Sequence, residues 1–201
     1  MLLALVFVAF GGLAGVFVVG LAFASVVLHE LGHAVVARRL GVRIAGIELG
    51  FFGGAAKMAS LPRTPRDELA IAAAGPAVSM VLAGLGLGLG VGLHSTFLAM
   101  VGWINFAIAL FNLIPALPMD GGRILRAALT KPMGYVRATD LAVTISRVVA
   151  IGFVFAGLAG WYQLLFLAPF LWMLGSRERL IARAVAARSA RVVAIPYGFP
   201  R

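Results

Sequence analysis

The chain consists mainly of long apolar stretches separated by short groups of basic residues. These stretches predict one spanning helix over residues 10–37, two over roughly 69–93 and 96–117, and two more over 139–175. A helix needs about 20 mostly apolar residues to cross a bilayer. We therefore expect an all-α polytopic membrane protein with about five to six transmembrane helices.

The basic residues between these stretches predict how the chain is oriented. They fall in three blocks, which run from Arg38 to Arg66, from Arg123 to Arg147 and from Arg177 to Arg201. Cytoplasmic loops carry an excess of Lys and Arg, so we expect all three blocks on the cytoplasmic side. This order predicts a transmembrane core over residues 1–175 and a basic cytoplasmic tail over 176–201.

A segment of different character follows the first predicted span. Residues 42–60 are partly alternating and rich in β-branched and glycine residues, and they contain Gly53 and Gly54. This pattern predicts a short β-hairpin or sheet element. Because unpaired backbone cannot face lipid, we expect this element at the membrane interface or paired with another strand. A peptide substrate is one candidate for that strand.

The composition excludes several classes of protein. Hydrophobic residues make up 62% of the chain and charged residues only 12%, whereas a soluble domain carries roughly 25% charged residues. The chain has no cysteine, so disulfides and thiolate metal sites are excluded. The net charge of +10 does not predict nucleic-acid binding, because the basic residues lie between apolar blocks as membrane loops do.

The first motif along the chain that indicates a catalytic or metal-binding function is His29-Glu30-Leu31-Gly32-His33. On a helix, residues four apart lie on one face with Cβ atoms about 5–6 Å apart, so both imidazoles can reach one zinc ion at roughly 2.0–2.1 Å. Glu30 lies beside His29 and can act on water as a general base. A polar cluster without metal is the alternative, but ionisable groups inside an apolar helix are costly and usually functional.

A catalytic zinc site has three protein ligands and one open position. His94, the remaining histidine, falls in a predicted outer turn, whereas Asp120 ends an apolar span among Pro115, Pro118 and two glycines. Broken backbone at membrane depth is tolerated where it lines a cavity. We therefore expect Asp120 to be the third ligand, with a simple helix end as the alternative.

The other acids have simpler explanations. Acids in the first turn of a helix complement its dipole, and we expect this of Asp67, Glu68 and Asp140. Glu178 falls in the basic tail and Glu48 in the predicted hairpin.

Together these motifs resemble the site-2 protease family of intramembrane zinc metalloproteases. The resemblance covers roughly residues 20–175 and rests on three segments, which are residues 25–33, Ala74-Gly75-Pro76, and residues 111–126. It is greatest with the archaeal and bacterial branch that often carries regulatory cystathionine-synthase-type domains. We expect the chain to depart from the pattern at both ends. Residues 1–9 are too short to form the usual first helix, which leaves open a truncated start or a dispensable helix, and we expect no regulatory domain after Arg201.

The resemblance implies a six-helix core and one zinc ion on His29, His33 and Asp120, with Glu30 as the base. Asn112 matches a family position near the active site, and we expect Asn112, Gly53, Gly54 and Pro115 to support the substrate or the active site. Residues 139–175 resemble a lateral gate through which such enzymes admit substrate.

We therefore expect an intramembrane zinc endopeptidase that cuts membrane-anchored proteins within or near their transmembrane segments, as in regulated intramembrane proteolysis. A divalent-metal transporter or channel is the alternative. Expected partners are a membrane-spanning protein substrate and membrane lipid, without nucleic acid. We expect a multi-pass protein of the cell membrane whose active site lies near the cytoplasmic side. The sequence leaves open the substrate, the cleaved bond, the regulator and the oligomeric state.

Overall fold

The computed structural model describes residues 12–42, 44–50, 53–58 and 64–193. The predictions for residues 1–9 and for the end of the basic tail lie outside these residues. The chain divides into two compact units, Met1–Leu113 and Ile114–Arg201, and each is described in turn.

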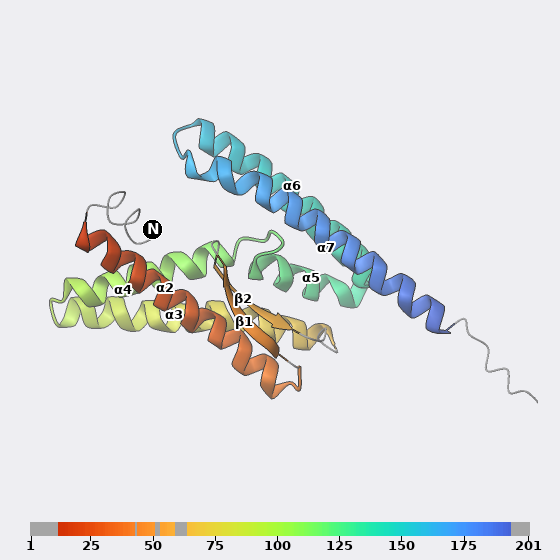
Figure 1. The fold of residues 1–201 in the computed structure, drawn as a ribbon, viewed down its shortest axis with the longest axis horizontal. Helices are drawn as coiled ribbons and strands as arrows, with labels where there is room; N and C mark the ends of the chain where they lie inside the picture. The colour runs from red at the N-terminus through yellow and green to blue at the C-terminus, as the bar shows by residue number, and fades with distance from the viewer. Residues whose placement is uncertain (1–11, 43, 51–52, 59–63, 194–201) are drawn as a thin grey trace, which may run out of the picture. The chain divides into compact units, whose positions relative to one another are not determined.

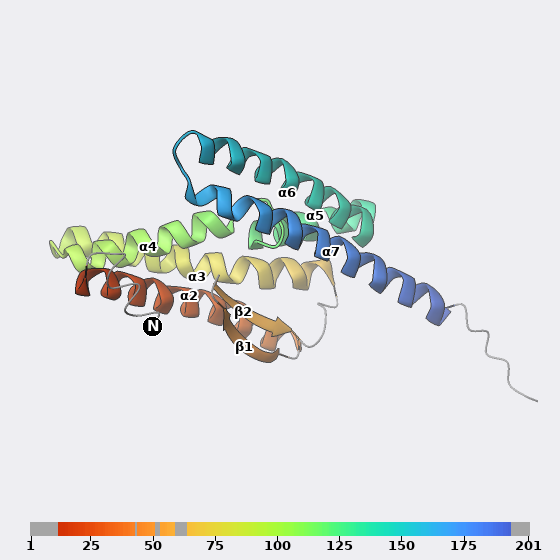
Figure 2. The same ribbon diagram turned by 45° about the horizontal axis from the view of Figure 1, so that its top comes forward.

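The first unit contains three neighbouring helices, α2 (Leu13–Arg39), α3 (Pro65–Gly92) and α4 (Thr96–Asn112). They lie side by side in both views (Figures 1 and 2). The start of α3 has a capping box, in which the Thr64 side chain accepts from the Asp67 N–H and the Asp67 carboxylate accepts from the Thr64 N–H. These bonds satisfy amides that the first helical turn leaves without partners.

Helices α3 and α4 approach each other through small residues. A methyl group at Gly86 of α3 would lie 2.6 Å from the backbone nitrogen of Gly102 on α4, so the two backbones are in direct contact there. Small residues allow this close approach between helices in an apolar environment. The chain turns between the two helices at His94, whose φ is 51°.

Two strands connect α2 to α3 in sequence (Figure 1). Strand β1 (Ile44–Gly50) pairs antiparallel with β2 (Gly53–Met58), with Leu49 opposite Gly54 and Gly50 opposite Gly53. Phe51 and Phe52, which belong to the same predicted hairpin segment, lie outside the described residues. The paired backbones provide hydrogen-bond partners for each other.

The second unit contains α5 (Asp120–Met133), α6 (Tyr135–Leu158) and α7 (Gln163–Val193). Helices α6 and α7 are joined by a short turn and lie side by side in Figures 1 and 2. Helix α7 continues without interruption to Val193, across the predicted boundary between core and tail at residue 175.

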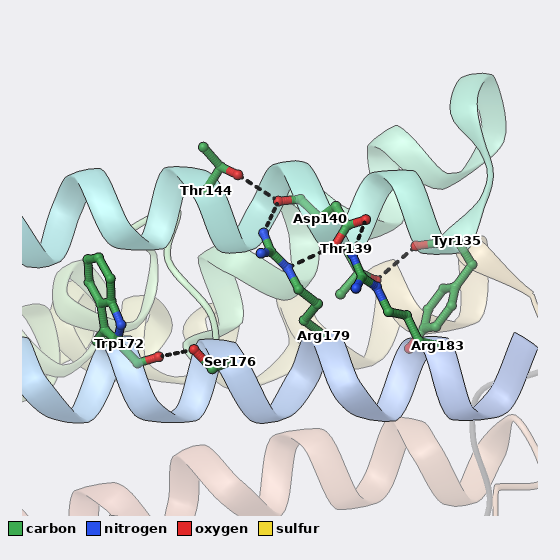
Figure 3. A network of polar contacts seen from close by, with 8 residues as sticks. All are labelled: Tyr135, Thr139, Asp140, Thr144, Trp172, Ser176, Arg179 and Arg183. Atoms are coloured by element: carbon green, nitrogen blue, oxygen red, sulfur yellow. Dashed lines mark hydrogen bonds and ion pairs between the residues drawn. The ribbon is translucent and has the colours of Figure 1, made fainter.

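Charged side chains connect α6 to α7, as Figure 3 shows. The Asp140 carboxylate lies 2.8 Å from Nε of Arg179 and 3.4 Å from Nη2 of Arg183. Arg126 of α5 lies 2.8 Å from the Glu178 carboxylate on α7. Asp140 is therefore not the helix-opening acid that we expected, since the first turn of α6 contains no acid. Glu178 lies on helix α7, where it pairs with Arg126.

The predicted fold class is wrong in its number of spans. We expected five to six transmembrane helices, whereas only three of the described helices, α2, α3 and α6, are long and apolar enough to cross a membrane. Helix α4 has 17 residues and ends at Asn112, shortly before Pro115, which cannot continue a helix. Helix α5 is short, and α7 places its charged residues from Arg177 onward in the same helix as its apolar start.

Candidate metal centre

The two histidines of the H-E-x-x-H motif meet on one face of α2. His29 is 2% exposed and His33 is 4% exposed. Their Nε2 atoms lie 3.2 Å apart, and their rings meet edge to face with centroids 4.9 Å apart. The helical spacing therefore brings the two imidazoles together as the sequence predicted.

Helix α3 fixes both rings from the other side. Nδ1 of His33 lies 2.6 Å from the carbonyl oxygen of Ile71, and Nδ1 of His29 lies 2.9 Å from Oγ of Ser79. A carbonyl can only accept, so Nδ1 of His33 carries the proton and donates it. In the neutral ring this leaves the lone pair on Nε2, which is the tautomer that a metal ligand needs.

Gly75 of α3 makes room for the pair. A methyl group at this position would lie 2.6 Å from Nε2 of His29 and still closer to Nε2 of His33. Gly32 of α2 is also close to α3, since a methyl group there would lie 2.9 Å from the carbonyl oxygen of Ala74. The absence of side chains at both glycines lets α3 approach the histidine face of α2.

This geometry fits two ligands of one zinc ion. Two nitrogens bound at roughly 2.0–2.1 Å in a tetrahedral arrangement are separated by roughly 3.3 Å, and the observed Nε2 separation is 3.2 Å. Each ring also has the hydrogen bond at its other nitrogen that metal-bound histidines usually make. The residues present therefore suit a zinc ion.

Asp120 belongs to the second unit, where it is the first residue of α5 and is 7% exposed. We expected it to end the span over residues 96–117. Instead α4 ends at Asn112, and residues 113–119 form an irregular segment that leads into α5. The first turn of a helix favours a negative charge, so this position suits an ionised carboxylate.

The other predicted site residues lie on α2, at the end of α4, in the irregular segment and on β2. Glu30 follows His29 on α2 and is half-buried. Asn112 is the last residue of α4, and its side-chain amide donates to the carbonyl of Ile108 at 2.9 Å. Pro115 is exposed in the irregular segment. Gly53 and Gly54 begin β2, where their backbones pair with β1.

Ser79, which holds His29, was not among the residues predicted from the sequence, and Gly75 was singled out only within the motif Ala74-Gly75-Pro76. Ile71, Gly75 and Ser79 are spaced four residues apart on α3, so they share one face. A serine one turn after a glycine in an apolar helix is the signal that could have identified this face.

The family of the chain follows from a comparison with known proteins. A family model described as peptidase family M50 matches residues 16–95 and 88–155. These residues include both histidines, Glu30 and Asp120. The chain belongs to peptidase family M50.

Individual M50 relatives agree with this assignment. A zinc metalloprotease of Methanocaldococcus jannaschii is 39% identical over 163 residues, which cover 79% of this chain and 48% of the relative. A putative zinc metalloprotease of Mycobacterium tuberculosis is 37% identical over 172 residues, covering 77% of this chain and 44% of the relative. The chain thus spans about half the length of the curated relatives it matches.

A solved structure is similar as well. The site-2 protease from Methanocaldococcus jannaschii superposes with a TM-score of 0.70 at 34% identity, covering 89% of this chain and 84% of that one. The family and the names of these relatives imply zinc as the metal. With three helices long and apolar enough to cross a bilayer, this M50 chain is a membrane protein. These relatives are proteases by name and give no support to the transporter.

Proposed function

We propose that this M50 chain is an intramembrane zinc endopeptidase, which hydrolyses peptide bonds within or near the transmembrane segments of membrane-anchored proteins. The observation that carries the proposal is the pair of Nε2 atoms 3.2 Å apart on an apolar helix. Ionisable side chains are costly to place in an apolar membrane helix, so their presence there indicates a function. The family to which the chain belongs is one of peptidases.

The proposed ligand set is His29, His33 and Asp120, with one zinc ion per chain. Each of the three offers one ligand atom and each is buried. Two imidazoles and one carboxylate are a usual donor set for catalytic zinc, and they leave the fourth position open.

Three of the other acids have partners of their own. Asp67 caps the start of α3, Asp140 pairs with Arg179 and Arg183, and Glu178 pairs with Arg126. A carboxylate in an ion pair would lose that partner on moving to a metal. These contacts make Asp67, Asp140 and Glu178 poor candidates for the third ligand.

Zinc bound at this set would polarise the peptide carbonyl and lower the pKa of a bound water to about 7. The chain's own residues supply the rest. Glu30 is the proposed general base: it takes the proton of the attacking water and passes it to the leaving amine. The hydrogen bond from His33 to the Ile71 carbonyl and the one between His29 and the Ser79 hydroxyl keep the rings in one orientation during this transfer.

Asn112, Pro115, Gly53 and Gly54 are proposed to support the substrate or the active site. Asn112 and Pro115 flank the start of the segment that leads to Asp120, and Pro115 prevents that segment from continuing α4. The glycines at the start of β2 allow close approach of another backbone.

The proposed location is the cell membrane, with the active site near its cytoplasmic side. Arg38 and Arg39 are exposed in the last turn of α2, and such residues favour the cytoplasmic face. His33 lies six residues before Arg39, or about 9 Å along the helix axis. Water could thus reach the site from that face, while a membrane-spanning protein substrate and lipid would contact the chain from the side.

A cleavage assay tests this function. Purified protein in detergent is incubated with a single-pass membrane protein, with and without a zinc chelator, and the products are identified by mass spectrometry. We expect a new terminus within or next to the transmembrane segment, and its loss with chelator. Cleavage that persists after complete zinc removal would contradict the proposal.

A further inference from the structure

The segment before Asp120 is tied to α6 by one buried hydrogen bond. The backbone N–H of Leu117 donates to Oγ of Ser146 at 2.7 Å, and the Ser146 hydroxyl donates to the carbonyl of Ala142 at 2.7 Å. Leu117 and Ser146 are both 0% exposed. The serine thus accepts from one segment and donates within its own helix, so its hydroxyl has a defined orientation.

Apolar contacts hold the same segment in place. Leu117 packs with Ala142 and Val143 of α6, and Ala116 packs with Ala150 of α6. These positions lie on the same face of α6 as Ser146, because they are three to four residues apart. The segment is therefore seated along two turns of this helix.

The first turn of α5 lies against the other side of the segment. A methyl group at Gly122 would collide with the backbone of Ala116 and Leu117. The N–H of Met119 donates to the carbonyl of Ala116 at 2.9 Å. Leu117 is therefore enclosed between α6 and the turn that begins with Asp120, three residues further on.

We infer that Ser146 is a positioning residue for Asp120, acting through the backbone of Leu117. The inference rests on the proposed function, because it takes Asp120 as a zinc ligand. Two prolines in the segment lack an N–H, so few backbone donors are available to fix its path. Without the Ser146 oxygen, the Leu117 N–H would be buried without an acceptor, which favours a different path for the segment.

Ser146→Ala tests the inference, with metal affinity measured by competition against a chelator. Loss of a group that orients a metal ligand typically weakens metal binding 10–100-fold, and we expect about a tenfold loss here. We also expect the rate constant kcat to fall with KM for the substrate unchanged, because Ser146 is proposed to act on the ligand and not on substrate binding.

Thr139→Val is the matched control. Thr139 lies on the same helix and is also 0% exposed. Among the described residues, its hydroxyl donates within its own helix, to the Tyr135 carbonyl at 2.8 Å (Figure 3). This variant should bind zinc as the wild type does. If Thr139→Val weakens zinc binding as much as Ser146→Ala, a general loss of packing explains both effects and the inference is overturned.

The Asp120→Ala variant distinguishes failure of the inference about Ser146 from failure of the proposed function. If Asp120→Ala loses zinc affinity while Ser146→Ala keeps it, the role of Ser146 is overturned and the ligand set stands. If Asp120→Ala keeps its affinity, both are overturned.

A measurement on the wild type covers the case in which Ser146→Ala does not fold. After removal of metal by chelator, hydrogen exchange at the Leu117 amide should still be slow, because its partner is Ser146 and not the ion. Rapid exchange at this amide in the folded, metal-free protein would overturn the inference.

Discussion

Gly75 on α3 lies directly against the imidazole of His33 on α2, with no side chain between the helix backbone and the ring. A methyl group at Gly75 would come too close to His33 and would lie 2.6 Å from Nε2 of His29. The space that the glycine leaves is thus next to both nitrogens that are proposed to bind zinc. A single methyl group tests whether that space matters.

We predict that Gly75→Ala loses most of its zinc, because the added methyl group forces the two rings out of their present positions. Overpacking of this kind also costs typically 1–3 kcal/mol of stability. Elemental analysis of the purified protein measures the zinc. Gly84→Ala is the control, since a methyl group at Gly84 of the same helix has no neighbour within 4 Å. A Gly75→Ala protein with full zinc occupancy would show that the space is not needed.

We predict that Ser79→Ala weakens zinc binding by roughly tenfold or more, because partners of metal-bound histidines typically contribute that much. The hydroxyl lies 2.9 Å from Nδ1 of His29, and alanine cannot replace it. Ser25→Ala is the comparison: Ser25 is equally buried, one turn from His29, but accepts from the Asn105 amide at 3.0 Å. The Ser25→Ala variant should be less stable than the wild type and should keep its zinc affinity. Equal zinc affinities for the two variants would show that Ser79 does not support zinc binding by His29.

We predict that Asp120→Ala lowers zinc occupancy markedly, since it removes one of the three proposed protein ligands. Asp140→Ala provides the control within the same unit, because Asp140 pairs with Arg179 and Arg183 (Figure 3). Partly exposed ion pairs contribute at most about 1 kcal/mol each, so Asp140→Ala should unfold slightly earlier and retain zinc. Full zinc occupancy in folded Asp120→Ala would direct attention to Glu48 as the alternative ligand.

The sequence predicted the elements that depend on local pattern. The apolar stretches marked where α2, α3 and α6 lie, and the four-residue spacing of His29 and His33 was enough to bring their rings together. Both follow from the helical period, which is a property of neighbouring residues.

The sequence could not predict features that depend on packing. Ser79 looked like any small residue of an apolar helix until the approach of α2 and α3 put its hydroxyl beside His29. Asp120 was predicted to end a span because the apolar residues before it do not indicate where α4 ends. The two prolines predicted that the helix breaks, but they did not predict at which residue. The overestimated number of spans has the same origin, because hydropathy alone does not show where a helix ends.

Glu30 is proposed to act as a base beside a zinc ion held by other residues. Glutamine has nearly the shape of glutamate but cannot accept the proton of water. The most direct test measures zinc content and cleavage of a transmembrane substrate together, for the wild type and for Glu30→Gln in the same detergent. We predict about one zinc per chain in both proteins and cleavage by the wild type alone. Loss of zinc from folded Glu30→Gln, or cleavage by it at the wild-type rate, would contradict this role of Glu30.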